Sequence, residues 1–152
     1  MHGLIPRLMP VSLDTLGLAE TLENLVRDWQ RRNPNIKLTL RHELPSDLGP
    51  SVTLAAYRVV QEGLINALRH ARAAQIEISL EGDSGTRMLI TVTDDGVGLP
   101  ETWARPGHFG LRGLRERVEH LGGRLTVGNR EPHGVSLVAE IPLTIPTAVV
   151  TS

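Results

Sequence analysis

Polar residues that can bind a magnesium-bound phosphate group cluster within a segment expected to be helical from Ser51 to Ala71. At about 100° per residue, Glu62, Asn66, Arg69 and His70 fall on the side opposite an apolar stripe. A carboxylate and an amide oxygen on adjacent turns suit Mg²⁺, and a cationic side chain one turn on can reach phosphate oxygens. The solvated side of an amphipathic helix would give the same pattern. Asn66 weighs against that alternative, because Asn is a mediocre helix former in mid-helix.

A second candidate feature is the turn Asp94-Asp95-Gly96-Val97-Gly98, which directly follows an apolar strand. Two spaced glycines form a tight turn whose backbone a flat ligand can approach closely. Asp94 can accept a hydrogen bond from an exocyclic amine such as that of adenine. A surface turn is the plain alternative. A calcium loop is a weaker one, because the alternating oxygen ligands that it needs are missing after Asp95.

A third candidate is the stretch Gly107-His108-Phe109-Gly110-Leu111-Arg112-Gly113, which leads into a helix. Glycines that let backbone N–H groups point outward at a helix N-terminus form a site for phosphates. The spacing differs from the Rossmann and P-loop fingerprints, and the motif set of the eukaryotic-type protein kinases is absent. Each of the three features alone is weak evidence for a nucleotide site. Their occurrence together, in this order along the chain, is stronger evidence.

Alternating and helical patterns predict the elements that must position these residues. The order is helix, strand, helix, two strands, helix, two strands, which predicts an α+β two-layer sandwich with a mixed, mostly antiparallel sheet and helices on one face. The expected helices run from Asp14 or Thr15 to about Arg32, from Ser51 to about Ala71, and from Phe109 or Gly110 to Gly122-Gly123; the expected strands are Ile36–Arg41, Gln75–Leu80, Arg87–Thr93, Arg124–Val127 and Val135–Ile141.

Composition excludes several classes of function. The 152 residues are 40% hydrophobic and 22% charged, which predicts one globular domain, and the net charge of −1 with 3% aromatics argues against a nucleic-acid partner. The absence of cysteine excludes disulfides and thiolate chemistry. No apolar run approaches a membrane span, and the start does not resemble a signal peptide. We therefore expect a cytoplasmic domain without direct membrane contact, whose parent protein can be anchored in the inner membrane.

These stretches resemble the ATP-binding boxes of the GHKL superfamily. Glu62-x-x-x-Asn66 with Arg69-His70-Ala71 resembles the N box, Asp94-x-Gly96-x-Gly98 the G1 box, and Gly107 to Leu111 the G2 box. The segments RVVQEGLINALRHARA and FGLRGLRERVEHLGGRL are similar to the corresponding segments of sensor histidine kinases of the NarX, UhpB and DesK type. The resemblance covers about Leu4 to Pro142. It implies a Bergerat fold with a flexible ATP lid over Asp95–Phe109.

The resemblance also implies a role for each matched residue. Asn66 would bind Mg²⁺ that bridges the ATP phosphates, Glu62 would be the catalytic acidic residue, and Asp94 would hold the adenine amino group. Val135 stands where the family often has a threonine, and Ser136 is the candidate to replace that hydroxyl. The residues expected to contact the nucleotide are Asn66, Arg69, His70, Asp94, Gly96, Gly98, Gly107, His108, Phe109, Gly110, Leu111, Gly113 and Ser136.

The function implied is the ATP-binding catalytic domain of a two-component sensor histidine kinase. Residues 1–13 would be a lead-in from the dimerisation domain, with an added tag at 1–3, residues 14–143 the catalytic domain, and 144–152 a flexible tail. No histidine here has the context of the family's phosphoacceptor. We therefore expect the γ-phosphoryl group to pass to a histidine on a separate dimerisation domain, and from there to a response regulator through the parent kinase. The isolated chain is expected to bind ATP without phosphorylating itself.

Two other functions fit parts of the pattern. A GHKL ATPase or an anti-sigma-type serine kinase would share the three ATP-binding boxes, but the segment GLRGLRERVEHLGG favours the sensor kinases. A non-catalytic partner-binding module with a degenerate pocket is supported only by Val135 in place of a threonine.

Overall fold

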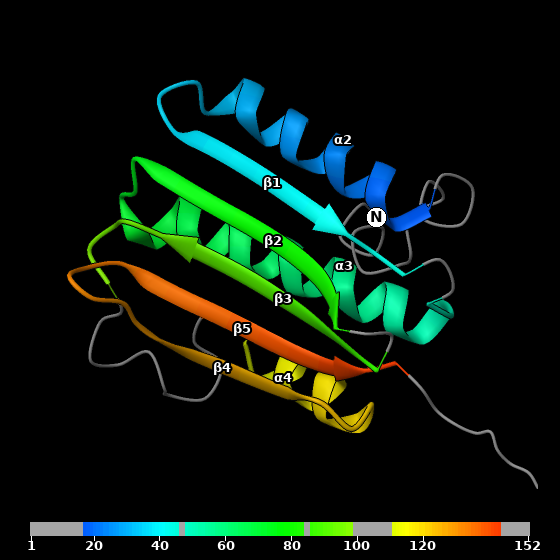
Figure 1. The fold of residues 1–152 in the computed structure, drawn as a ribbon. Helices are drawn as coiled ribbons and strands as arrows, with labels where there is room; N and C mark the ends of the chain where they lie inside the picture. Colours follow the sequence, from blue (N-terminus) through cyan, green and yellow to red (C-terminus); the bar gives the residue numbers. More distant parts are fainter. Residues whose placement is uncertain (1–16, 46–47, 84–85, 99–110, 144–152) are drawn as a thin grey trace, which may run out of the picture.

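Helices and strands follow one another in the order expected from the sequence (Figure 1). The computed structural model describes residues 17–45, 48–83, 86–98 and 111–143. None of the helices in these ranges is long and apolar enough to cross a membrane. The elements are α2 (Gly17–Arg32), β1 (Lys37–Glu43), α3 (Pro50–Asn66), η2 (Ala67–Ala71), β2 (Gln75–Asp83), β3 (Arg87–Asp94), α4 (Leu111–His120), β4 (Arg124–Asn129) and β5 (Val135–Pro142).

The strands form one mixed sheet in the order β1-β2-β3-β5-β4. β1 and β2 are parallel, and α3 connects them, whereas the other neighbouring strands are antiparallel. Figure 1 shows α2, α3 and α4 on the same face of this sheet. The predicted α+β two-layer sandwich is therefore confirmed, and β3 lies at its centre between β2 and β5.

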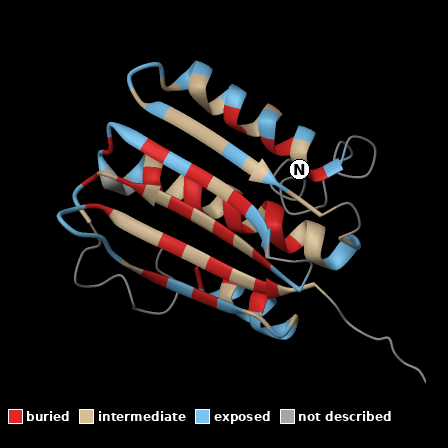
Figure 2. Ribbon diagram, in the orientation of Figure 1, coloured by how far each residue is buried: buried red, intermediate tan, exposed pale blue. Residues whose placement is uncertain are grey.

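The core fills the space between the sheet and the helices. Along β3, Met88, Ile90 and Val92 are buried and alternate with partly exposed residues, as a strand with one covered face requires (Figure 2). α3 approaches the sheet closely at Gly63, where an added Cβ would lie 3.0 Å from the side chains of both Val92 and Leu137. The contact between Gly63 and Val92 fixes how α3 sits along β3.

α4 packs against β4 and β5, the two strands on one side of the sheet. Leu111, Leu114 and Val118 are buried on one side of this helix. Its end is a Schellman motif, in which Gly123 N–H donates to the Val118 carbonyl at 3.0 Å and Gly122 N–H to the Glu119 carbonyl at 2.9 Å. Gly122 has the positive φ of 85° that this motif needs, so the glycine C-cap expected from the sequence is present.

The last turn of the central helix differs from the sequence prediction. A regular α-helix was expected to about Ala71, but Ala67–Ala71 form a π-helical turn, and Arg72 then adopts a left-handed conformation with φ of 54°. A π turn holds more residues than an α turn. The 100° spacing that placed Arg69 and His70 on the polar side therefore holds only as far as Asn66.

Candidate functional site

Asp94, the last residue of β3, is buried although it carries a carboxyl group. Its exposure is 4%, and it continues the alternation of β3 residues that face the helices. The Gly96 backbone N–H donates to Oδ1 of Asp94 at 2.8 Å. Burial raises the pKa of Asp94, and hydrogen bonds from the Gly96 and Val135 backbones oppose this increase. The structure therefore presents a poorly solvated carboxylate at the end of the central strand, suited to accept a hydrogen bond from a bound ligand.

The polar residues of α3 lie at the same end of the sheet as Asp94. α3 joins two parallel strands, so it runs antiparallel to them and in the same direction as β3 (Figure 1). From the contact between Gly63 and Val92, Asp94 lies two residues further along β3, and Asn66 lies three residues further along α3. Glu62 and Asn66 are both partly exposed. Asn66 and Asp94 thus share one face and one end of the sheet, the arrangement that a single ligand contacting both requires.

Asp95 fastens the turn after β3 to the start of β2. Its Oδ1 accepts hydrogen bonds from the backbone N–H groups of Ala74 and Gln75, at 2.8 and 2.9 Å. These bonds, the one from Gln75 first, lower the pKa of Asp95. The two adjacent carboxyl groups therefore have opposite pKa shifts: Asp95 stabilises the turn as an anion, whereas burial disfavours the charge of Asp94.

The turn between β4 and β5, residues 129–134, packs against the backbone of Asp94. Arg130 Nη1 donates to the Asp94 carbonyl at 2.7 Å, and the Arg130 backbone N–H donates to the Gly134 carbonyl at 2.9 Å. Gly134 has a φ of 106°, and an added Cβ would clash with the Asp94 carbonyl oxygen. Gly98, with a φ of 91°, lies against the same turn, because its added Cβ would lie 2.9 Å from Oδ1 of Asn129.

Gly134→Ala is expected to destabilise the domain by about 3 kcal/mol, because it combines an unfavourable φ with a backbone clash. Chemical denaturation would measure the loss as a lower midpoint. Gly128→Ala is the matched control in the same hairpin, since a Cβ there meets nothing within 4 Å. Equal stability of the two variants would show that the approach of Gly134 to Asp94 is not as close as described.

Several predicted site residues lie outside the described residues, namely Gly107, His108, Phe109 and Gly110 with most of the expected lid. The side chain of His70 is also not described. Leu111 and Gly113 belong to the first turn of α4, where Leu111 is buried and Gly113 is exposed. Arg69 is exposed in the π-helical turn.

The placement of Ser136 does not support it as a replacement for the missing threonine hydroxyl. Ser136 is paired with Thr93, the neighbour of Asp94 in β3. Directly paired residues project from the same face, and consecutive residues from opposite faces. Ser136 therefore projects from the face of the sheet that the helices leave uncovered, whereas Asp94 projects from the other. Val135, on the Asp94 side, contributes its backbone rather than a hydroxyl.

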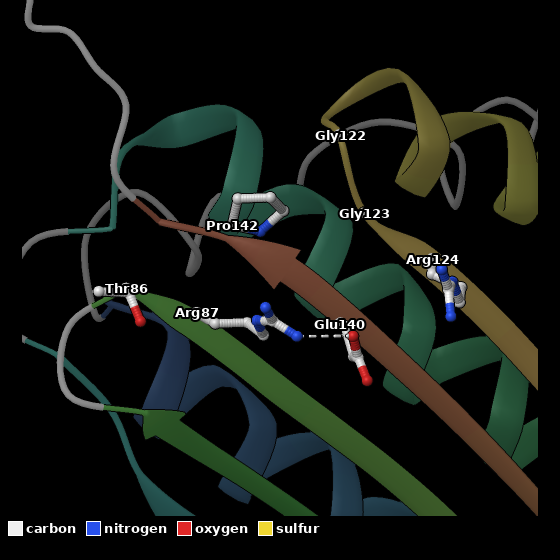
Figure 3. A pocket seen from close by; sticks show the side chains of 7 residues that line it. All are labelled: Thr86, Arg87, Gly122, Gly123, Arg124, Glu140 and Pro142. Atoms are coloured by element: carbon white, nitrogen blue, oxygen red, sulfur yellow. Dashed lines mark hydrogen bonds and ion pairs between the residues drawn. The ribbon is translucent and has the colours of Figure 1, made fainter.

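A separate surface pocket lies at the other end of the sheet. Figure 3 shows Arg87 and Glu140 within it, joined by an ion pair of 3.0 Å, with Arg124 on the neighbouring strand. Arg87 begins β3 and Asp94 ends it, so this pocket is roughly 23 Å from Asp94 at the usual rise per residue. It contains none of the residues predicted to bind a nucleotide.

Comparison with known proteins identifies the family of this chain. Residues 51–145 match the family described as histidine kinase-, DNA gyrase B- and HSP90-like ATPase. The chain is 32% identical over 145 residues to the histidine-protein kinase/phosphatase DegS of Brevibacillus brevis, covering 95% of this chain and 37% of DegS. It is 36% identical over 144 residues to UhpB of Salmonella typhimurium, covering 93% of this chain and 28% of UhpB. It thus spans about a third of the length of these relatives.

A solved structure shows the same fold. The histidine kinase domain of the blue-light activated histidine kinase EL346 from Erythrobacter litoralis superposes with a TM-score of 0.68 at 30% identity. The match covers 83% of this chain and 65% of that one. The chain therefore belongs to the histidine kinase-, DNA gyrase B- and HSP90-like ATPase family. Within it, its relatives are sensor histidine kinases that include the UhpB type, as the sequence motifs predicted.

Proposed function

We propose that this chain binds ATP with Mg²⁺ and supplies the γ-phosphoryl group to a histidine on a separate dimerisation domain. The observation that carries the proposal is the position of Asp94 and Asn66 on one face and one end of the sheet, in a chain that belongs to an ATPase family. The two side chains would contact opposite ends of one ATP molecule. Because ATP is the substrate, the domain would act in the cytoplasm.

Each end of the site would perform a different task. Asp94 would accept a hydrogen bond from the adenine amino group, in a turn that Gly96 and Gly98 keep open. Asn66 would offer an amide oxygen to Mg²⁺, a donor type that this ion prefers, and Glu62 one turn earlier would orient the attacking group. Bound Mg²⁺ would neutralise charge on the phosphates. Arg69 and the start of α4 would position the phosphoryl group, and positioning with charge neutralisation accounts for most of such catalysis.

The test is transfer between two separate polypeptides. The chain is incubated with ATP radiolabelled at the γ-phosphate and with a dimerisation segment of the parent kinase that carries its acceptor histidine. We expect acid-labile label on that segment and none on this chain. A segment whose acceptor histidine is replaced by glutamine is the control and should remain unlabelled.

Other outcomes would separate the alternative functions. Acid-stable label would indicate a serine or threonine acceptor and contradict histidine transfer. Release of phosphate without label on any protein would indicate an ATPase. A response regulator added to the labelled segment should then take up the phosphoryl group, because we place this domain at the start of that relay.

A further inference from the structure

A side-chain contact with no role assigned so far reaches Asp94 from the turn between β4 and β5. Arg130 and Asp94 are 36 residues apart in sequence, yet the Arg130 guanidinium donates to the Asp94 carbonyl oxygen at 2.7 Å. Arg130 is an exposed residue, but this contact is partly buried. It therefore spans from solvent to the end of the central strand.

The rest of the turn holds Arg130 in this place. The Arg130 backbone N–H donates to the Gly134 carbonyl at 2.9 Å, which closes the turn. Gly134 in turn lies against the Asp94 carbonyl, with no room for a side chain. Two groups from one turn thus contact the same carbonyl oxygen, and the backbone of Asp94 determines where its carboxylate points.

The charge of Arg130 also acts on the Asp94 carboxylate. Burial raises the pKa of Asp94 and the neighbouring Asp95 adds to this effect, whereas the Arg130 guanidinium opposes it. Val135, on the Asp94 side of β5, stands where the resembled family often has a threonine, and valine has no hydroxyl to offer Asp94. Arg130 therefore favours the charged form of Asp94 at a site whose carboxylate otherwise relies on backbone N–H groups.

We propose that Arg130 is a positioning residue for adenine recognition, which acts by anchoring Asp94 so that its carboxylate meets the amino group of the base. This inference rests on the proposed function, in which Asp94 accepts a hydrogen bond from adenine. Arg130 itself does not touch the nucleotide. The effect of removing it should thus be confined to nucleotides that Asp94 can recognise.

The test compares ATP with inosine triphosphate, which has an oxygen in place of the adenine amino group. Calorimetry on Arg130→Ala should show ATP binding about tenfold weaker, as expected for loss of a charge-assisted hydrogen bond, and unchanged inosine triphosphate binding. Arg130→Lys should recover part of the ATP affinity, because it keeps the charge and a donor. Arg124→Ala is the matched control, since Arg124 is an exposed arginine at the other end of β4.

Asp94→Asn, measured alongside, separates the two ways in which the inference can fail. If Asp94→Asn keeps wild-type ATP affinity, Asp94 does not recognise adenine, and the proposed function and the role of Arg130 fail together. If Asp94→Asn loses ATP affinity while Arg130→Ala keeps it, only the inference about Arg130 is overturned. Equal weakening of both nucleotides in Arg130→Ala would show that Arg130 merely supports the fold, which also overturns it.

Discussion

Asn66→Ala is expected to remove the Mg²⁺-dependent part of ATP affinity, weakening ATP binding in the presence of Mg²⁺ by roughly 100-fold. The amide oxygen of Asn66 is the proposed ligand of the ion, and alanine offers no oxygen. The fold should remain, because Asn66 is the last, partly exposed residue of α3 and alanine is the better helix former. Calorimetry with and without Mg²⁺ measures the affinity, and thermal denaturation checks the fold.

Asn35→Ala provides the matched control, because Asn35 is exposed in the loop between α2 and β1. This variant should bind ATP like the wild type in both conditions. The same Mg²⁺ dependence in Asn66→Ala as in the wild type would remove Asn66 from the metal site.

Asp94→Asn is expected to weaken ATP binding by about 100-fold and to stabilise the nucleotide-free domain at neutral pH. The Gly96 and Val135 N–H groups would hold the amide oxygen of asparagine, which leaves its NH₂ group facing the adenine amino group, donor against donor. The stability effect has a different cause. Burial raises the pKa of Asp94 above its unfolded value, so the contribution of this group to stability is lost as pH rises through the folded-state pKa.

At neutral pH the wild type therefore bears the cost of a buried charge that asparagine does not carry. The difference in melting temperature between Asp94→Asn and the wild type should be positive at pH 7 and should shrink as the pH falls below the unfolded pKa of aspartate, near 4. Asp83→Asn is a control of the same chemistry at the far end of β2. A destabilised Asp94→Asn at pH 7 would show that the carboxylate stabilises the fold and would contradict the expected cost of its burial.

Local patterns were sufficient to predict most of the fold. The alternation of β3, the apolar stripes of the helices and the glycines after α4 are all signals that a short window of sequence carries. The central helix ends near Ala71 as predicted, but the π-helical form of its last turn was not predicted. The π-helical turn Ala67–Ala71 directly precedes Arg72, which has a left-handed backbone conformation. No residue type in that stretch indicates a π-helical turn.

The candidate site was predictable only in part, for a physical reason. Asp94 and Asn66 stand in motifs that can be recognised along the chain. Arg130 and Gly134 contact Asp94, and the backbone of Gln75 contacts its neighbour Asp95; strand pairing brings all three to the end of β3. The face of the sheet from which Ser136 projects was unpredictable for a related reason, because the pairing with Thr93 decides it.

A crystal structure of the chain with a non-hydrolysable ATP analogue and Mg²⁺ is the most direct test of a nucleotide held at both ends. The adenine amino group should lie within hydrogen-bonding distance of the Asp94 carboxylate, and the amide oxygen of Asn66 should coordinate the ion beside the phosphates. An analogue bound with its base away from Asp94, or seated in the pocket beside Arg87, would contradict this account.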